Sequence, residues 1–222
     1  MESRVSYLEN MLSNLGYNDS LRAMDWMMEE MCAEKGYKRH NGSHYYYHLI
    51  DAAQDALNFG IREEPVITGI LLHDSIEDIP GVTAKMIESL YGTRVAISVD
   101  LVTKKEDVDY KIAENVKEYL FQILQNRDSS LMKTADRKHN FSTLRDATPE
   151  KKLKQAIETE KFFIPFFKDC RKKYVRYSSY FFSAKTAIEP HLWEIKEHFE
   201  EVKLLKEEIE RLKSGSKSNA AV

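Results

Sequence analysis

The chain has 222 residues, with 33 Lys plus Arg against 36 Asp plus Glu, so its formal net charge is -3. This length suits one large domain with an extension and is too short for a second catalytic domain. The balanced charge gives no overall attraction to nucleic acid or to an anionic membrane. Two distant cysteines, Cys32 and Cys170, argue against a disulfide scaffold and against a zinc-thiolate site, and they favour a reducing compartment.

Neither a signal peptide nor a membrane span is predicted. Charged residues interrupt the apolar ones between residues 1 and 16, so the apolar core of a signal peptide is missing. The longest apolar stretch, residues 65–72, is far shorter than the ~20 residues that cross a bilayer. We therefore expect a cytoplasmic protein that does not insert into membranes.

Apolar residues recur at spacings of three and four along nearly the whole chain, and alternation with period two is rare, which predicts an all-α fold. The predicted helices cover residues 4–14, 20–35, 47–59, 64–76, 83–91, 93–102, 109–125, 128–146, 149–163, 165–185 and 189–213. Residues 191–213 are predicted to form an amphipathic helix that packs on the body or on a partner. Residues 214–222 consist mostly of Ser, Gly, Asn and Ala without a core residue, which is typical of a flexible tail.

The segment from Leu71 to Asp78, LLHDSIED, carries four ionisable side chains directly after an apolar run. On a continuous helix, His73 would lie four residues from Glu77, and Asp74 four residues from Asp78, so one imidazole and three carboxylates would face one cleft. The alternative is an ordinary solvated helix end. A His-Asp pair directly after a buried run costs free energy unless something compensates it, which favours a functional site.

Two further segments supply candidate metal ligands. His48 is predicted near the start of helix 47–59, and Asp136 lies inside helix 128–146. Each alone is more typical of a structural residue, a capped or core histidine and a salt-bridged aspartate. Together with His73 and Asp74 they provide two imidazoles and two carboxylates, a set that suits Mn, Fe or Zn better than Ca.

These spacings resemble the HD-domain metal-dependent phosphohydrolases and, more specifically, the hydrolase domain of the RelA/SpoT family. The residues that carry the resemblance are Arg39-x-x-Gly42-x-x-Tyr45-x-x-His48, Leu71-Leu72-His73-Asp74-x-x-Glu77-Asp78, Tyr91-Gly92-x-x-Val95 through Leu101-Val102-Thr103-Lys104, Lys133-x-Ala135-Asp136-Arg137-x-His139-Asn140-x-x-Thr143-Leu144, and Glu158-Thr159 with Pro165. The match runs from about residue 35 to residue 165. Fewer than sixty residues follow it, so the chain resembles a hydrolase-only member without a synthetase domain.

The resemblance implies an HD-domain helical bundle over residues 1–190. It also implies hydrolysis of the 3′-diphosphate of the alarmone (p)ppGpp, or of ppApp, with release of pyrophosphate, and one Mn²⁺ or another divalent ion per chain. The residues it implies are the metal ligands His48, His73, Asp74 and Asp136, the catalytic acids Glu77 and Asp78, and the substrate contacts Arg39, Asn140 and Thr143, with Lys133 and Arg137 as weaker candidates. For Arg137, a structural salt bridge is an equal alternative.

Other functions stay open. A related phosphohydrolase would remove the 2′-phosphate of NADPH or dephosphorylate a 5′-nucleotide, and a non-catalytic alternative is an antitoxin-like partner of an alarmone synthetase. The family has Pro where this chain has Leu49, and residues 44–47 also differ, so guanine and adenine both remain candidate bases. The aromatic and basic residues between 162 and 182 favour a core face beside a solvated face over a site for single-stranded nucleic acid. A homo-oligomer or a toxin partner is compatible with the sequence.

Overall fold

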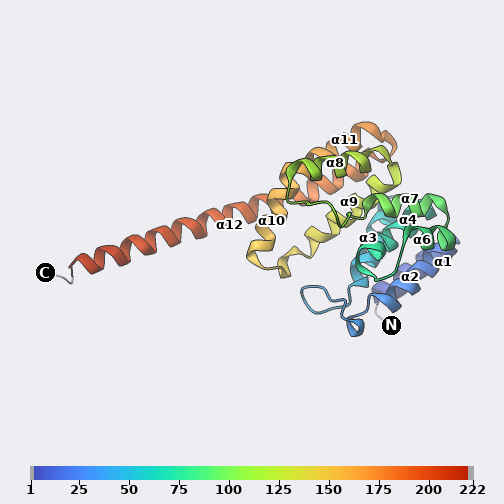
Figure 1. Ribbon diagram of the computed structural model, residues 1–222, viewed down its shortest axis with the longest axis horizontal. Coiled ribbons are helices and arrows are strands. Elements are labelled where there is room, and N and C mark those ends of the chain that lie inside the picture. The colour runs from blue at the N-terminus through green and yellow to red at the C-terminus, as the bar shows by residue number, and fades with distance from the viewer. Residues whose placement is uncertain (1–2, 220–222) are drawn as a thin grey trace.

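The computed structural model describes the backbone of residues 3–219 and the side chains of residues 3–211, and it has the predicted all-α fold (Figure 1). Within these residues the β-type pairing is confined to one isolated bridge between Lys38 and His44. The first half contains α1 (Ser3–Leu15), α2 (Asn18–Glu30), η1 (Ala33–Lys35), α3 (Tyr46–Asn58), α4 (Glu64–Leu72), α5 (Ser75–Asp78), α6 (Ala84–Tyr91) and α7 (Thr93–Val102). The second half contains α8 (Ala113–Gln125), α9 (Arg127–Ser142), η2 (Leu144–Asp146), α10 (Pro149–Glu158), η3 (Thr159–Phe163), α11 (Ile164–Lys173), η4 (Val175–Tyr177) and α12 (Ser178–Asn219).

Helix α9 forms the centre of the bundle. It packs against α3, α4, α7, α8 and α12, and every residue from Asp128 to Arg137 is buried. Its hydroxyl groups bond to backbone carbonyls; Thr134 Oγ1, for example, donates to the Ser130 carbonyl at 2.7 Å. Ser129 and Ser130 donate instead to carbonyls outside the helix, those of Ser98 and Ile123. Because these polar groups are satisfied, a polar segment can occupy the core and carry Asp136 into it.

A close approach between α4 and α9 brings the C-terminal part of α4 against the interior of α9. A Cβ atom at Gly69 would lie 2.7 Å from the Met132 sulfur, so any larger residue would displace the Met132 side chain. Glycine at this position lets α4, which ends next to His73, pack tightly on the helix that carries Asp136.

The predicted helix 149–163 consists of α10 and a π-helical turn, η3, and it continues into α11 without the expected gap. Pro165 has no N–H group and cannot donate the bond that would continue an α-helical pattern there. A π turn shifts the bonding pattern by one residue and accommodates the proline within the helical path.

The sequence predicts a break in the helices between residues 185 and 189, but the break lies between α11 and α12, at residues 174–177. Tyr174 leaves the helical region with φ -115° and ψ 67°, and α12 then runs through Pro190 without a break. Packing holds this helix together because one of its faces is buried over almost four turns; the buried residues are Tyr180, Phe181, Ala184, Ile188 and Leu192. Phe163, Phe166, Phe167 and Phe181 are buried, as the predicted core face requires, whereas Phe182 is 44% exposed.

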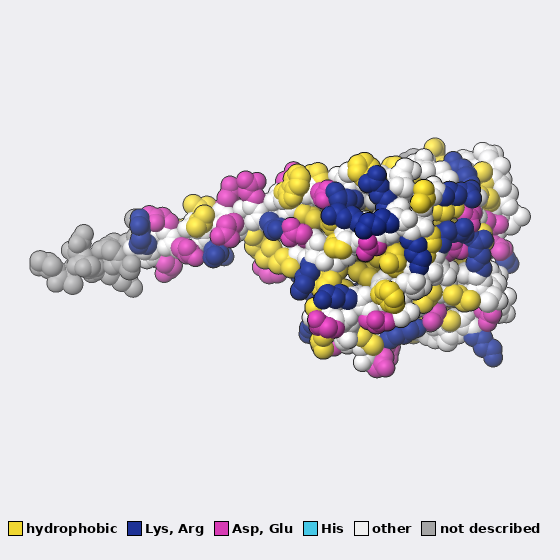
Figure 2. All heavy atoms as spheres, turned by 90° about the horizontal axis from the view of Figure 1, so that it is seen from above, with side chains coloured by type: hydrophobic (Ala, Val, Ile, Leu, Met, Phe, Trp, Pro, Cys, Tyr) yellow, Lys and Arg dark blue, Asp and Glu magenta, His cyan; other side chains and the backbone are white. Residues whose placement is uncertain are grey.

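The outer part of α12 extends away from the body (Figures 1 and 2). Leu204, Leu205 and Ile209 are 56%, 62% and 49% exposed there. The helix crosses the predicted boundary at residues 190 and 191, so the division into a body and an added helix stays a prediction. Its backbone is helical to Asn219, which includes most of the predicted tail, while residues 220–222 lie outside the described residues. Among residues 3–219, no helix is both long and apolar enough to cross a bilayer.

Candidate metal centre

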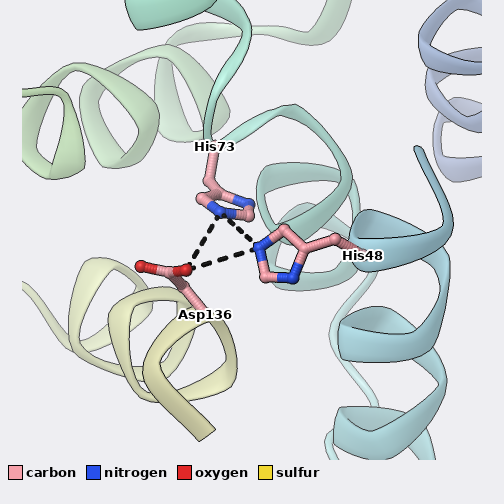
Figure 3. A group of neighbouring side chains, drawn as sticks. All are labelled: His48, His73 and Asp136. Carbon is pink, nitrogen blue, oxygen red and sulfur yellow. Dashed lines mark hydrogen bonds and ion pairs between the residues drawn. The ribbon is translucent and has the colours of Figure 1, made fainter. Parts of the chain in front are cut away.

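Three buried side chains from three separate segments of the chain meet at one point (Figure 3). His48 lies in the first turn of α3, His73 directly follows α4, and Asp136 lies in the middle of α9. The His48 Nε2 atom is 3.4 Å from His73 Nε2 and 3.3 Å from Asp136 Oδ1, and His73 Nε2 is 3.6 Å from the same oxygen. In sequence, His73 lies 25 positions after His48, and Asp136 lies 63 positions after His73, so the helix packing brings the three together.

The helix that was predicted over residues 64–76 is interrupted at the site. α4 ends at Leu72, and Asp74 has φ -97° and ψ -2°, outside regular helical geometry. Ser75 Oγ donates to the freed carbonyl of Leu72 at 2.6 Å. On a continuous helix the side chains of His73 and Asp74 would point about 100° apart, and the interruption lets both face the same group.

Asp74, the fourth predicted ligand, borders this cluster. Its Oδ2 atom lies 3.0 Å from His73 Nε2 and 3.9 Å from His48 Nε2. The Tyr45 hydroxyl donates a 2.8 Å hydrogen bond to the same carboxylate oxygen. The structure therefore brings all four predicted ligands together, with Asp74 on the more exposed side.

The donor atoms fit a transition-metal ion. Protein nitrogen and oxygen ligands bind Zn²⁺ and similar ions at about 2.0–2.2 Å, which places neighbouring ligand atoms roughly 3.0–3.5 Å apart. The two histidine Nε2 atoms lie 3.0 to 3.9 Å from each other and from the nearest carboxylate oxygens of Asp74 and Asp136. His73 also donates from Nδ1 to the Ile70 carbonyl at 2.8 Å, so its Nε2 atom is directed into the cluster.

Burial and the neighbouring carboxylates act in opposite directions on the two imidazoles. Burial lowers the pKa of His48 to about 4, and its hydrogen bond with Asp136 opposes this only in part. Burial also disfavours the charged form of His73, but Asp74 and Asp136 outweigh it and raise the pKa of His73 well above its usual value. Cationic charge between the carboxylates is thus favoured, whether from a proton or from a metal ion.

Lys133 and Arg137, the weaker substrate candidates, are buried in α9. The Lys133 Nζ atom lies 2.9 Å from Asp136 Oδ2, and this ion pair, against the effect of burial, lowers the pKa of Asp136 and raises that of Lys133. The Arg137 guanidinium lies 3.0 Å from Glu158 Oε2 and also donates to Thr159. Of the two alternatives for Arg137, the geometry favours the structural salt bridge. Lys133 contacts the candidate metal ligand Asp136 and does not line the cavity described below.

The three principal substrate candidates form one hydrogen-bonded group. Arg39 donates to Thr143 Oγ1 at 2.6 Å and to Asn140 Oδ1 at 3.4 Å. Asn140 in turn donates to Asp136 Oδ1 at 2.5 Å, so it contacts a candidate metal ligand as well. Changes at Asn140 will therefore also act on the candidate metal ligand Asp136, whereas Arg39 and Thr143 are one contact further away.

A cavity of about 350 Å³ adjoins the cluster and contains both predicted catalytic acids. Its lining residues are Lys38, Arg39, His40, Tyr45, Asp74, Glu77, Asp78, Lys104, Asn140, Thr143, Leu144, Lys151 and Gln155. Burial, followed by the charges of Asp74 and Glu77, raises the pKa of Asp78 to about 6. Glu77 Oε2 accepts a hydrogen bond of 3.3 Å from the Lys104 backbone N–H.

Several residues at the site were absent from the predicted set. Tyr45 holds Asp74, and His139 contacts His48 with 2.6 Å between the two Nδ1 atoms. Both belong to the motifs quoted above, and their positions in those motifs were the available signal. Lys38, Lys104 and Lys151 also line the cavity. Lys104 also belongs to a quoted motif, whereas Lys38 and Lys151 reach the cavity only because their segments meet in the folded chain.

No family model matches the chain. Curated relatives include the GTP pyrophosphokinase of Myxococcus xanthus, 33% identical over 139 residues, and the bifunctional (p)ppGpp synthase/hydrolase SpoT of Escherichia coli, 32% identical over 138 residues. The guanosine-3′,5′-bis(diphosphate) 3′-pyrophosphohydrolase of Aquifex aeolicus is 34% identical over 130 residues. The chain is homologous to the hydrolase region of RelA/SpoT proteins. These matches cover 59%, 60% and 58% of this chain but only 18%, 19% and 18% of the relatives.

A solved structure shows that the fold is that of the HD-domain SpoT hydrolases. It belongs to a protein described as a metazoan ortholog of SpoT that hydrolyses ppGpp and plays a role in starvation responses. The TM-score is 0.60 at 18% sequence identity, over 82% of this chain and 95% of the other. The RelA/SpoT resemblance in the motifs is thus confirmed at the level of sequence homology and of fold.

Proposed function

We propose that this protein is a metal-dependent hydrolase that removes the 3′-diphosphate of guanosine 3′,5′-bis(diphosphate), or of its pentaphosphate or adenosine relatives, as pyrophosphate. The observation that carries the proposal is the position of Asp74, which borders the buried His48, His73 and Asp136 cluster and also lines the adjoining cavity. A divalent ion held by these residues, Mn²⁺ being the first candidate, would lower the pKa of a bound water and offset charge on the phosphoryl group.

The charges around the cavity suit a nucleotide with two diphosphate groups. Its acidic lining residues are Asp74, Glu77 and Asp78, and its basic ones are Lys38, Arg39, His40, Lys104 and Lys151. Phosphate groups need cationic partners, and Arg39 can offer paired donors to two phosphate oxygens. The acids lie beside the candidate metal ligands, where water must be activated. The cavity can therefore both bind phosphate groups and activate water.

The two acids divide the proton chemistry in this proposal. The oxygen of a water molecule attacks the phosphorus bonded to the 3′ oxygen, and the bond between phosphorus and that oxygen breaks. Glu77, oriented by the Lys104 N–H, accepts the proton of the water. Asp78, whose pKa of about 6 leaves part of it protonated near neutral pH, provides a proton to the leaving 3′ oxygen.

The names of the relatives support the same proposed reaction. Proteins with 30% or more identity include several named guanosine-3′,5′-bis(diphosphate) 3′-pyrophosphohydrolases. The matched region is only about a fifth of those proteins, so the substrate of this chain remains part of the proposal.

A product assay with a panel of nucleotides tests the proposal. The purified protein is incubated with ppGpp, pppGpp, ppApp, NADPH or 5′-nucleotides, each with and without Mn²⁺. We expect GDP and pyrophosphate from ppGpp with Mn²⁺ only, no reaction by His73→Ala, and normal reaction by His191→Ala, which changes a half-exposed histidine on α12. Release of inorganic phosphate from NADPH or a 5′-nucleotide, with every 3′-diphosphate left intact, would replace the proposal with one of those activities. Lack of any product would favour a non-catalytic binding role.

A further inference from the structure

His139 is a nearly buried residue that the proposed reaction does not use. It lies on α9, three residues after Asp136, and its side chain is 11% exposed. Its Nδ1 atom is 2.6 Å from His48 Nδ1, and its Nε2 atom is 3.5 Å from Asp51 Oδ2. Asp51 lies on α3 and accepts a 2.7 Å hydrogen bond from Arg4 of α1. These contacts form a continuous path from a surface ion pair to a candidate metal ligand.

The close contact between two ring nitrogens restricts the protonation of both histidines. A hydrogen bond between them needs one hydrogen, so one Nδ1 atom donates and the other accepts. The opposite nitrogen of His48, Nε2, faces His73 and Asp136. For Nε2 to bind a metal ion through its lone pair, the single proton of a neutral His48 must lie on Nδ1. His139 then accepts at Nδ1 and carries its own proton on Nε2, directed towards Asp51.

We propose that His139 and Asp51 are positioning residues that fix the Nδ1-protonated tautomer and the ring orientation of His48. Because the ligand role of His48 is part of the proposed function, this inference depends on the metal centre, though not on the identity of the substrate. Neither residue contacts the reacting atoms.

The two histidine ligands differ in how they are oriented. His73 donates from Nδ1 to a backbone carbonyl, that of Ile70, which no substitution removes. His48 has a side chain, His139, in the equivalent place, and that side chain depends on Asp51 and Arg4. A second cavity of about 350 Å³ is lined by Arg4, His48, Asp51 and His139, so this path is also accessible from outside the reaction cavity. Loss of such a partner typically weakens metal binding about 10–100-fold.

Metal titration of the metal-free protein tests the proposal without substrate. We expect His139→Leu, which removes the acceptor, to weaken Mn²⁺ binding about 10–100-fold in calorimetry or chelator competition. His139→Asn, which retains an acceptor oxygen near the position of Nδ1, should recover most of the affinity. Asp51→Leu should give a smaller loss, and His191→Leu, the control on α12, none. Wild-type affinity in His139→Leu would overturn the proposal.

A second measurement remains informative if His139→Leu does not fold. In ¹H–¹⁵N spectra of the wild-type protein loaded with diamagnetic Zn²⁺, His48 should carry its proton on Nδ1, and a proton on Nε2 would overturn the proposal. Failure of the protein to bind either Mn²⁺ or Zn²⁺ would overturn both this inference and the metal-dependent reaction. Weakened metal binding in His139→Leu, in a protein that cleaves no nucleotide of the panel, would support the inference and contradict the proposed function alone.

Discussion

The Arg39 guanidinium donates a 2.6 Å hydrogen bond to the hydroxyl of Thr143, 104 residues further along the chain. Both residues line both cavities of about 350 Å³, so this contact lies on the wall between them. The guanidinium carbon is also 5.5 Å from the centre of the Tyr45 ring, whose hydroxyl bonds to Asp74. Arg39 thus connects the C-terminal end of α9 with Tyr45, the hydrogen-bond partner of the candidate ligand Asp74.

Arg39→Ala is expected to lower kcat/KM for ppGpp roughly 10–150-fold, because hydrogen bonds to charged groups contribute about 1.5–3 kcal/mol. Mn²⁺ affinity should stay unchanged, since Arg39 contacts none of the four ligand side chains directly. Steady-state kinetics and metal titration of the same preparations measure both quantities. Arg145→Ala, at an exposed position on η2, is the control. Equal activity of the two variants would exclude Arg39 as a substrate contact.

Glu77→Gln should retain the metal ion and lower turnover on the order of a hundredfold, the usual scale for loss of general acid-base help. Asp78→Asn should give a loss of similar size, because the amide cannot provide a proton to the leaving oxygen. Elemental analysis and single-turnover rates of the two variants separate metal binding from chemistry. If Glu77→Gln loses its metal, Glu77 is a ligand and its assignment as the proton acceptor is wrong.

Lys133→Met should destabilise the metal-free protein by about 3 kcal/mol, because it removes the lysine partner of the buried Asp136 carboxylate and leaves only the two histidines beside it. A metal ion at the site supplies the missing positive charge. We therefore expect Mn²⁺ to raise the Tm of this variant more than it raises the Tm of the wild type. Lys138→Met is the control. Lys138 lies on the same helix α9 but pairs with Asp55 of α3, and the Tm of this variant should rise with Mn²⁺ as much as that of the wild type. The same shift in all three proteins would contradict the electrostatic link between Lys133 and the metal.

Glu63 should make stability dependent on acidic pH. Burial raises its pKa, but hydrogen bonds from Tyr177 and Arg94 and the charge of Arg127 outweigh burial and leave the pKa below its ordinary 4.5. The folded state thus binds the proton more weakly than the unfolded state does. The contribution of Glu63 is complete above pH 4.5 and is lost as the pH falls through the lowered pKa.

Glu63→Gln is accordingly expected to cost roughly 1 kcal/mol at pH 7, a modest value because the Arg94 side chain is 47% exposed and solvent weakens the ion pair. The cost should shrink towards pH 3. Urea unfolding at several pH values measures it, with Glu150→Gln, at an exposed position, as the control. A difference that does not change between pH 7 and pH 3 would show that the carboxylate charge is not responsible.

The sequence by itself predicted the all-α fold, because apolar residues must recur with the helical period wherever a helix lies on a core. It also identified His48, His73, Asp74 and Asp136 as one group, since their residue types and spacing match a known motif. Their proximity in the structure agrees with that prediction, while their roles as ligands await the metal titrations.

Tertiary structure decided which partner each polar side chain has. Periodicity could not show that Lys133 faces Asp136, that Arg137 faces Glu158, or that His139 contacts His48. The contact between His139 and His48 joins residues 91 positions apart. The interruption of α4 at His73 and the passage of α12 through Pro190 likewise depend on neighbours. Local spacing determines which face of a helix is apolar. The packing of one helix on another determines which polar atoms come into contact, and the candidate site is built from contacts of that kind.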